Sequence, residues 1–321
     1  MSATLENQRN VRLRRAVIDV GTNSIKLLVA DVSGHDVQPV HEESWQTRLG
    51  KSFYETHRLQ PDAIACTAEA VAEFSKTAHE NKATSIRVIA TSAVRDAVNP
   101  RDLTSAIEHA SGLKVEIISG ECEAKLVFQG VTTDPALAKI PLLLLDVGGG
   151  STEFILGRGE HKFLAHSFPL GTVRLMEKFP HSDPPTRSEF IACHDWIKNF
   201  LRNEVCPKLE PALRRENHSK EPLLVGTGGT TSILARMESK LDRYDRARIE
   251  ATRLSLEQIK VHRRHLWSLP LAERKEIIGL PKLHADVILT GVLIYETVME
   301  EFCFKQLRIS TRGLRFAAVM D

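Results

Sequence analysis

The sequence is poor in cysteine, in aromatic residues and in net charge, and each shortage excludes a class of protein. Its five cysteines are widely scattered and form neither a CxxC pair nor a zinc-like spacing, so they predict reduced thiols in the cytoplasm, not a disulfide framework. Aromatic residues make up 6% of the chain and the net charge is +2, so no nucleic-acid partner is expected. Any polyanion must therefore be bound by a local site.

A long apolar run is also missing. The longest apolar stretch begins at Val287 and is interrupted by Thr290 and Gly291, which leaves it well short of a membrane span. The basic start of the chain has no apolar signal-peptide core behind it. We therefore expect a cytoplasmic protein without membrane attachment, and 321 residues are enough for two packed domains.

What the sequence does contain is an internal repeat. The segment AVIDVGTNSIKLLVADV from Ala16 aligns with LLLDVGGGSTEFILGRG from Leu143. Each copy consists of an apolar run typical of a buried strand, a turn of small residues and a second apolar run. Because one supersecondary unit occurs twice, the sequence predicts two related domains.

Helix and strand patterns alternate around the two copies. Over residues 63–79, apolar side chains recur at the three- and four-residue spacing of a half-buried helix, and potential N-terminal caps mark the starts of others. Helices are expected from Pro61, Asn99, Thr186 and Ser255, strands from Ser85, Lys114, Pro222 and Gln306, and a last helix is expected to contain Leu314 and Phe316. This pattern indicates an α/β protein.

Both repeat turns place an acid next to small residues whose backbone amides can point at phosphate oxygens. The residues expected to bind phosphate are Gly21, Thr22, Asn23 and Ser24 in the first copy and Gly148, Gly149, Gly150, Ser151 and Thr152 in the second. A carboxylate beside phosphate needs a cation, so Asp19 and Asp146 predict a site for Mg²⁺, or alternatively Mn²⁺, bound largely through water. Taken alone, either copy is equally a hairpin turn that needs a positive φ.

A third glycine-rich loop follows the strand predicted from Pro222. The segment VGTGGTTSILARM from Val225 leads from a strand through Gly228, Gly229 and Thr230 into a helix. Such a helix N-terminus offers free amides and a favourable dipole to an anion. Three loops of this kind in one chain indicate a bound polyphosphoryl group.

The order of these loops resembles the actin, heat-shock chaperone and sugar-kinase superfamily, and the segments between them resemble the exopolyphosphatase and guanosine pentaphosphate phosphohydrolase family. The segments that carry the second resemblance are ATSAVRDAVN from Ala90, IISGECEAKLVFQGV from Ile117, PLGTVRL from Pro169 and HADVILTG from His284. The resemblance covers almost the whole chain and looks like a short two-domain form. It implies an α/β fold of two actin-like, ribonuclease H-like domains, with mixed sheets flanked by helices and an interdomain cleft. We expect residues 11–127 and 303–321 to form the first domain and residues 128–302 the second.

The resemblance also implies three catalytic residues. Glu123 corresponds to the water-activating glutamate, Arg95 to a phosphate-contacting arginine, and Glu153 to a second acid that directs water or metal. From the residues alone, Glu123 lies on a helix that starts directly after a predicted strand, where α/β sheets bind ligands, although a solvated helix face is the alternative. Lys26, at the position of Glu153 in the first copy, has no assigned role. The family often has arginine where this chain has His284, which weakens transfer of roles to the C-terminal region.

The implied activity is that of an exopolyphosphatase, which hydrolyses the terminal phosphoanhydride of inorganic polyphosphate with Mg²⁺. Guanosine pentaphosphate is a second expected substrate, and a homodimer is a possible assembly. Two alternatives stay open: a small-molecule kinase of the same superfold, and a non-catalytic sensor of polyphosphate or guanosine pentaphosphate. Release of phosphate without an added acceptor distinguishes the hydrolase from both.

Overall fold

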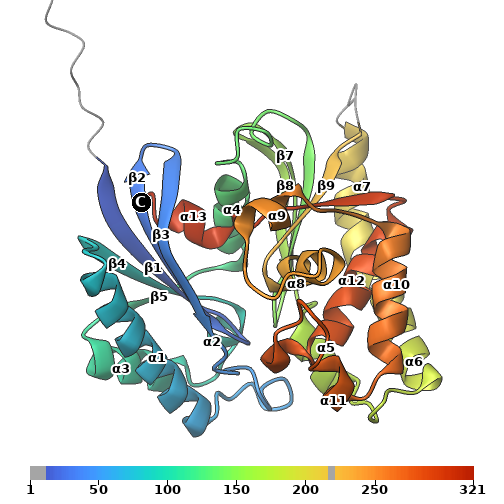
Figure 1. Cartoon of the computed structure of the whole chain (residues 1–321), viewed down its shortest axis with the longest axis horizontal. Coiled ribbons are helices and arrows are strands. Elements are labelled where there is room, and N and C mark those ends of the chain that lie inside the picture. The colour runs from blue at the N-terminus through green and yellow to red at the C-terminus, as the bar shows by residue number, and fades with distance from the viewer. Residues whose placement is uncertain (1–11, 216–220) are drawn as a thin grey trace, which may run out of the picture.

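The computed structural model describes residues 12–215 and 221–321, so the predicted first residue of the first domain, Val11, lies outside the described residues. Two mixed sheets lie side by side with helices around and between them (Figure 1). The first sheet contains β1 (Leu13–Val20), β2 (Ile25–Ser33), β3 (Asp36–Trp45), β4 (Ser85–Ala90) and β5 (Val115–Ile117). The second contains β6 (Leu142–Val147), β7 (Thr152–Arg158), β8 (His161–Phe168), β9 (Leu223–Thr227), β10 (Arg253–Ser255) and β11 (Gln306–Ile309).

The two sheets repeat one topology. Their strand orders are β3-β2-β1-β4-β5 and β10-β11-β9-β6-β7-β8. In the first sheet β1 pairs antiparallel with β2 and parallel with β4, and in the second β6 pairs antiparallel with β7 and parallel with β9. The predicted repeat is therefore confirmed as two hairpins, each followed by a parallel strand.

Helices and sheets alternate in layers, with α4 (Gly120–Val131) and α13 (Leu314–Ala318) between the two sheets (Figure 1). The outer face of the first sheet carries α1 (Pro61–Glu80) and α3 (Pro100–Ser111). The outer face of the second carries α6 (Arg187–Phe200), α8 (Gly229–Glu238), α10 (Leu256–Ser268) and α12 (Ile288–Glu301). The remaining helices are α2 (Ser92–Arg95), α5 (Thr172–Lys178), α7 (Cys206–Arg215), α9 (Arg246–Ala251) and α11 (Leu271–Arg274), with a π-helical stretch at Leu201–Val205 and a 3₁₀ turn at Lys282–His284.

This layering explains why the central strands are almost wholly apolar. Successive side chains of a strand point to opposite faces, so Ile18 packs under α1 and α3 while Val17 packs in the layer that contains α4. Leu143 and Leu144 of β6 divide in the same way between the outer and the inner core. A strand that is buried on both faces needs apolar residues at every position.

Local signals define several of the helix starts. Pro61 is the first residue of α1, and complete capping boxes begin α6 at Thr186 and α10 at Ser255, as predicted. Asn99 also precedes α3, but its side chain does not cap the helix. Its Oδ1 instead accepts a hydrogen bond from the amide of Leu59 at 2.9 Å, which ties the loop before α1 to α3.

The C-terminal segment divides between the two sheets, which differs from the expectation that everything after Cys303 returns to the first domain. The strand β11 pairs parallel with β9 and antiparallel with β10, and therefore belongs to the second sheet. The helix α13 packs against α4 and β1, and Asp321 after it pairs with Arg87 of β4, so the end of the chain reaches the first sheet. In the described parts of the chain, no helix combines the length and apolarity needed to cross a membrane.

Polar contacts join the two halves around the gap between them. Glu177 of α5 accepts a hydrogen bond from the backbone amide of Tyr54 at 2.9 Å, and Arg48 forms an ion pair with Asp286 at 2.9 Å. On the other side, Arg246 pairs with Glu42. These contacts hold the β1–β2 and β6–β7 turns close together.

Candidate active site

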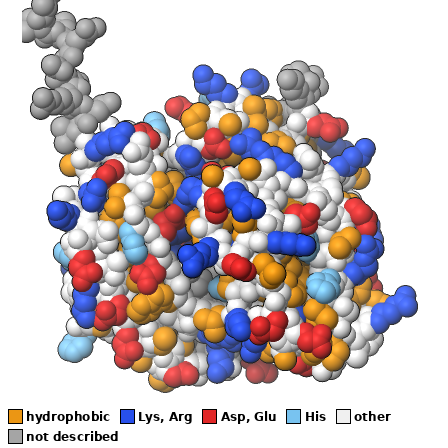
Figure 2. Space-filling model, viewed as in Figure 1, with side chains coloured by type: hydrophobic (Ala, Val, Ile, Leu, Met, Phe, Trp, Pro, Cys, Tyr) orange, Lys and Arg blue, Asp and Glu red, His pale blue; other side chains and the backbone are white. Residues whose placement is uncertain are grey.

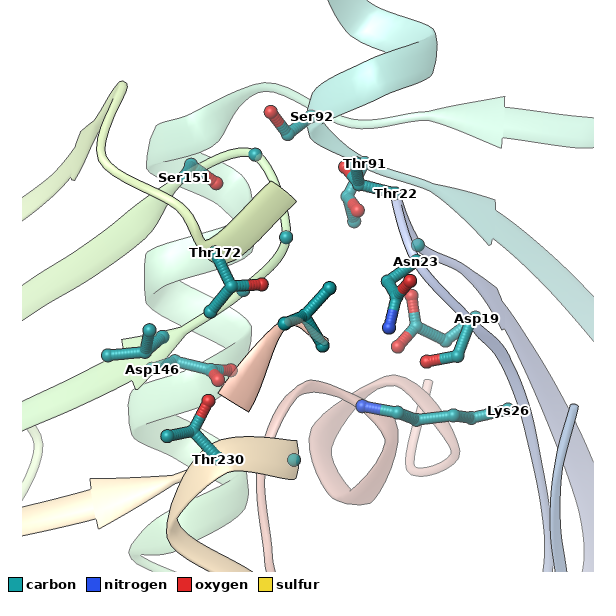
Figure 3. Close-up of a pocket in the computed structure, with 18 of the residues that line it drawn as sticks. Asp19, Thr22, Asn23, Lys26, Thr91, Ser92, Asp146, Ser151, Thr172 and Thr230 are labelled. Carbon is teal, nitrogen blue, oxygen red and sulfur yellow. The ribbon is translucent and has the colours of Figure 1, made fainter. Parts of the chain in front are cut away.

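The two repeat turns face each other across an open cavity of about 820 Å³, which we call the central cavity. Figure 3 shows Thr22, Asn23 and Asp19 on one wall and Asp146, Thr172 and Thr230 on the opposite wall. The turns are close: a Cβ at Gly149 would lie 2.9 Å from the Cβ of Thr22, and one at Gly150 would lie 3.0 Å from its Oγ1. Only glycine permits this approach, so the two acid-bearing turns share one site.

Each turn is closed by one internal hydrogen bond. The amide of Gly21 donates to the carbonyl of Ser24 at 3.1 Å, and the amide of Gly148 donates to the carbonyl of Ser151 at 2.9 Å. These two amides are therefore occupied, contrary to the expectation that they bind phosphate. The next amides in both turns, those of Thr22 and Asn23 and of Gly149 and Gly150, make no hydrogen bond within the described residues. They remain available to an anion.

The third loop joins this cavity at its edge. Gly229 and Thr230 line the central cavity, whereas Gly228 lines a larger adjoining cavity of about 1340 Å³. Gly228 has a φ of +89°, and a Cβ there would lie 2.4 Å from Oδ1 of Asp146. Glycine is thus required both for the backbone conformation and for the approach to this carboxylate.

The carboxylates of Asp19 and Asp146 face the cavity and make no hydrogen bond or ion pair with any described residue. Burial raises the pKa of both, to about 6 for Asp146, and the positive charge of Lys26 opposes this rise. Free carboxylate oxygens are ligands that Mg²⁺ prefers. In the described residues no group of three or more His, Cys, Asp or Glu side chains converges as a metal site. A cation held here takes its other ligands from water and phosphate.

Glu123 projects from the first turn of α4 towards the central cavity. Ser119 caps this helix by accepting a hydrogen bond from the amide of Cys122 at 3.1 Å, and Glu123 lies on the buried face with 9% of its surface exposed. Its carboxylate accepts a hydrogen bond from Nη1 of Arg95 at 2.9 Å. Burial raises the pKa of Glu123 to about 7, although Arg95 counteracts part of the rise.

Glu153 is the second acid at this end of the cavity. It is 1% exposed, and its Oε1 accepts hydrogen bonds from the hydroxyls of Ser151 at 2.9 Å and Ser167 at 2.7 Å. Burial raises the pKa of Glu153 well above its ordinary value, and the charges of Glu123 and Asp146 add to the effect. Because Glu123 has an arginine partner and Glu153 has only hydroxyls, Glu123 is the acid that ionises more readily.

Three predicted residues lie outside the central cavity. Arg95 lines a separate cavity behind Glu123, and Gly228 lines the adjoining one. The side chain of Thr152 turns away and donates its hydroxyl to the carbonyl of Leu170. The structure brings the other predicted residues together around the central cavity: Asp19, Gly21, Thr22, Asn23, Ser24, Glu123, Asp146, Gly148, Gly149, Gly150, Ser151, Glu153, Gly229 and Thr230.

Several polar residues of the site were not predicted from the sequence. Lys26, Thr91, Ser92, Thr172 and His284 also line the central cavity. Ser92 and Thr172 belong to the family-like segments that start at Ala90 and Pro169, which is the signal that could have found them. Burial, together with the charge of Lys26, lowers the pKa of His284 to about 4, so this histidine is neutral at physiological pH. It cannot supply the positive charge of the arginine expected at this position.

Charge of both signs is concentrated where the two halves meet. Figure 2 shows Lys and Arg side chains gathered along the middle of this face, with Asp and Glu side chains among them. The adjoining cavity shares Asp19, Lys26 and Asp146 with the central one, and it adds the cations Arg236 and Arg315 and the acids Glu42 and Glu43. The two cavities meet at the shared residues and together form one extended groove of mixed charge.

Comparisons with known proteins agree with this geometry. A family model described as the Ppx/GppA phosphatase family matches residues 28–320. Exopolyphosphatase 2 of Mycobacterium tuberculosis is 35% identical over 299 residues, which cover 90% of each chain. The solved structure of a Ppx/GppA family member from Aquifex aeolicus is 30% identical, with a TM-score of 0.77 and 97% coverage of both chains. An exopolyphosphatase structure from Cytophaga hutchinsonii is 26% identical, with a TM-score of 0.82 and coverage of 95% of this chain and 96% of that chain. The predicted fold class is confirmed.

Proposed function

The chain belongs to the Ppx/GppA phosphatase family, and from this premise we propose that it is an exopolyphosphatase that releases orthophosphate from the end of inorganic polyphosphate. The observation that supports this most strongly is the position of Glu123. Its buried carboxylate faces a cavity lined by both acid-bearing turns and lies beside Glu153. This is the arrangement that activation of water next to a bound terminal phosphate requires.

In the proposed reaction, the terminal phosphoryl group lies between the free amides of the two turns. Glu123 accepts a proton from a water molecule while the water oxygen bonds to the terminal phosphorus. The bridging P–O bond breaks, and its electrons stay on the oxygen of the shortened chain. Glu153, held by Ser151 and Ser167, orients the water or Glu123 itself.

Mg²⁺ is part of the proposal because four acids and one lysine line the central cavity. Asp19 and Asp146 would hold the ion largely through water, and the bound ion would shield phosphate oxygens from the carboxylates. Mn²⁺ is the alternative ion. The free oxygens of both aspartates fit this role.

The adjoining cavity supports a substrate longer than one phosphate. We propose that the remaining phosphoryl groups of the chain extend into it past Lys26 and Gly229. The same space offers room for the nucleoside of guanosine pentaphosphate, which makes that compound a second proposed substrate. The five cysteines are free thiols, which supports a reducing, cytoplasmic location as part of the proposal.

One experiment tests the function directly. Phosphate release is measured from long polyphosphate, tripolyphosphate, guanosine pentaphosphate and ATP, with and without Mg²⁺, for the natural protein and for Asp146→Ala. We expect Mg²⁺-dependent release from the polyphosphates and a large loss in the variant. Asp195→Ala is a matched control, because that side chain is 63% exposed on α6. If no substrate releases phosphate in the presence of Mg²⁺, the proposal is wrong.

A further inference from the structure

The separate cavity that Arg95 lines behind Glu123 has a volume of about 470 Å³, and we call it the rear cavity. It shares Ser92 and Ser151 with the central cavity, so the two adjoin at these residues. The hydroxyl of Ser92 is buried, with the residue 3% exposed, and it makes no hydrogen bond to any described residue. An unpartnered buried hydroxyl between two cavities indicates that a polar ligand passes or binds there.

The two cavities differ in charge. Among the described residues, four acids and one lysine line the central cavity, whereas Arg95, Arg174 and the single acid Asp96 line the rear cavity. Gly120, the first residue of α4, also lines the rear cavity, so the N-terminal end of this helix contributes its positive dipole. A phosphate without a bound cation is therefore more stable in the rear cavity than in the central one.

Arg174 lines this cavity and joins the two halves there. Its Nε donates to the carbonyl of Gly150 at 2.8 Å, and its Nη2 pairs with Asp96 at 3.2 Å. The guanidinium also lies 4.2 Å from the ring centroid of Tyr54. Nη1 of Arg174 makes no hydrogen bond within the described residues, so it is free to bind an anion.

We infer that the rear cavity is an orthophosphate site through which the product leaves, with Arg174 as its principal ligand. The inference rests on the proposed function. A polyphosphate chain bound through the central and adjoining cavities blocks the route by which it entered. The released phosphate then moves past Ser92 and Ser151 into the positively charged cavity, and the shortened chain can stay bound.

Product inhibition tests this assignment. Orthophosphate is added to the natural protein during hydrolysis of tripolyphosphate in Mg²⁺. We expect part of the inhibition to persist at saturating tripolyphosphate as a lowered kcat, because phosphate in the rear cavity does not compete for the central one. Inhibition that saturating tripolyphosphate removes completely would overturn the inference.

Two substitutions in one ion pair give the sharper test. Arg174→Met should weaken the kcat-lowering inhibition by about tenfold, because a charge-assisted ligand is lost. Asp96→Asn should strengthen it, because a competing anion is removed. If the pair were merely structural, both substitutions would shift the inhibition in the same direction, and that result would contradict the inference. Lys178→Met, an exposed charge one turn further along α5, should leave the inhibition unchanged.

Direct binding separates this inference from the proposed function. Equilibrium dialysis with radiolabelled orthophosphate is carried out without polyphosphate on the same four proteins. Weaker binding by Arg174→Met and tighter binding by Asp96→Asn support the rear site even if the natural protein hydrolyses no polyphosphate. If the natural protein hydrolyses polyphosphate but the variants bind orthophosphate equally, the rear site is wrong and the proposed function stands.

Discussion

The two repeat hairpins share their topology and turn geometry but carry opposite charges at one equivalent position. Lys26 lies opposite Asp19 across the first hairpin, and Glu153 lies opposite Asp146 across the second. Lys26 makes no hydrogen bond or ion pair with any described residue, whereas Glu153 is buried and held by two serine hydroxyls. The repeated backbone thus supplies two acid-bearing turns, and the residue opposite each aspartate gives the first wall one charge of each sign and the second wall two acids.

This difference suggests a division of labour. In the proposed function, the ammonium of Lys26 on the first wall would bind phosphate oxygens, while the second wall would face Glu123 and the attacking water. Figure 3 shows the side chain of Lys26 extending across the cavity towards the wall that carries Asp146 and Thr230.

The largest expected effect comes from removing the base beside the acidic wall. Glu123→Gln should lower kcat for tripolyphosphate by about 100-fold to 10,000-fold, because general base catalysis is lost. Phosphate release is measured under saturating Mg²⁺. Glu121→Gln, two residues earlier on the exposed face of the same helix, is the control and should retain activity. Near-normal release by Glu123→Gln would refute the proposed base.

A second substitution makes the two hairpins alike. Lys26→Glu gives both walls the same pair of acids and should lower kcat/KM for tripolyphosphate by roughly 10-fold to 100-fold, because a fifth carboxylate repels the substrate. Lys26→Arg keeps the charge and should lose less. Steady-state kinetics over a range of Mg²⁺ concentrations measure both. Equal activity of Lys26→Glu and the natural protein would show that the charge difference between the hairpins has no role.

The pH dependence of activity tests which carboxylate is the base. Because the pKa of Glu123 is raised to about 7, kcat should rise as the pH increases through about 7 and the carboxylate loses its proton. Arg95 favours the ionised form, so Arg95→Met should move this rise to higher pH. A pH–rate profile of both proteins with tripolyphosphate measures the shift. An unchanged or lowered midpoint in the variant would contradict the assignment.

The smallest expected effect concerns stability. Glu153 has a raised pKa in the folded protein, so its contribution to stability is complete below its unfolded pKa, near 4.5, and is lost as the pH rises. At high pH the buried, ionised Glu153 destabilises the folded protein, and Glu153→Gln removes this charge. The substitution should therefore increase the free energy of unfolding by about 1 kcal/mol at pH 8 and by less at pH 5. Urea denaturation of both proteins at the two pH values measures the difference in the free energy of unfolding. Greater stabilisation at pH 5 would show that the sign is wrong.

The sequence predicts local features of this protein better than non-local ones. The repeat, the helix that starts at Pro61 and both capping boxes depend on residues close together in the chain, and the structure contains them. The position of β11 in the second sheet depends on pairing with β9, which no local pattern encodes. The exposure of Lys26 to the cavity likewise follows from its register opposite Asp19.

The direction of side chains is the second feature of the site that the sequence predicts only in part. Residues 152 and 153 are neighbours on β7 and point to opposite faces, so Thr152 must turn away if Glu153 faces the cavity. The alternation of strand side chains could have excluded Thr152. Strand alternation does not predict the placement of Arg95 behind Glu123, because that placement depends on how α2 and α4 pack together.

The hydrogen bond that closes each acid-bearing turn affects the free energy of ligand binding. The bonds from Gly21 to Ser24 and from Gly148 to Ser151 fix the backbone before any ligand arrives. Little conformational entropy then remains to be lost when phosphate binds, so the free amides can contribute nearly their full interaction to affinity. The fold in this way holds a glycine-rich sequence in one backbone conformation, as the proposed binding of phosphate requires.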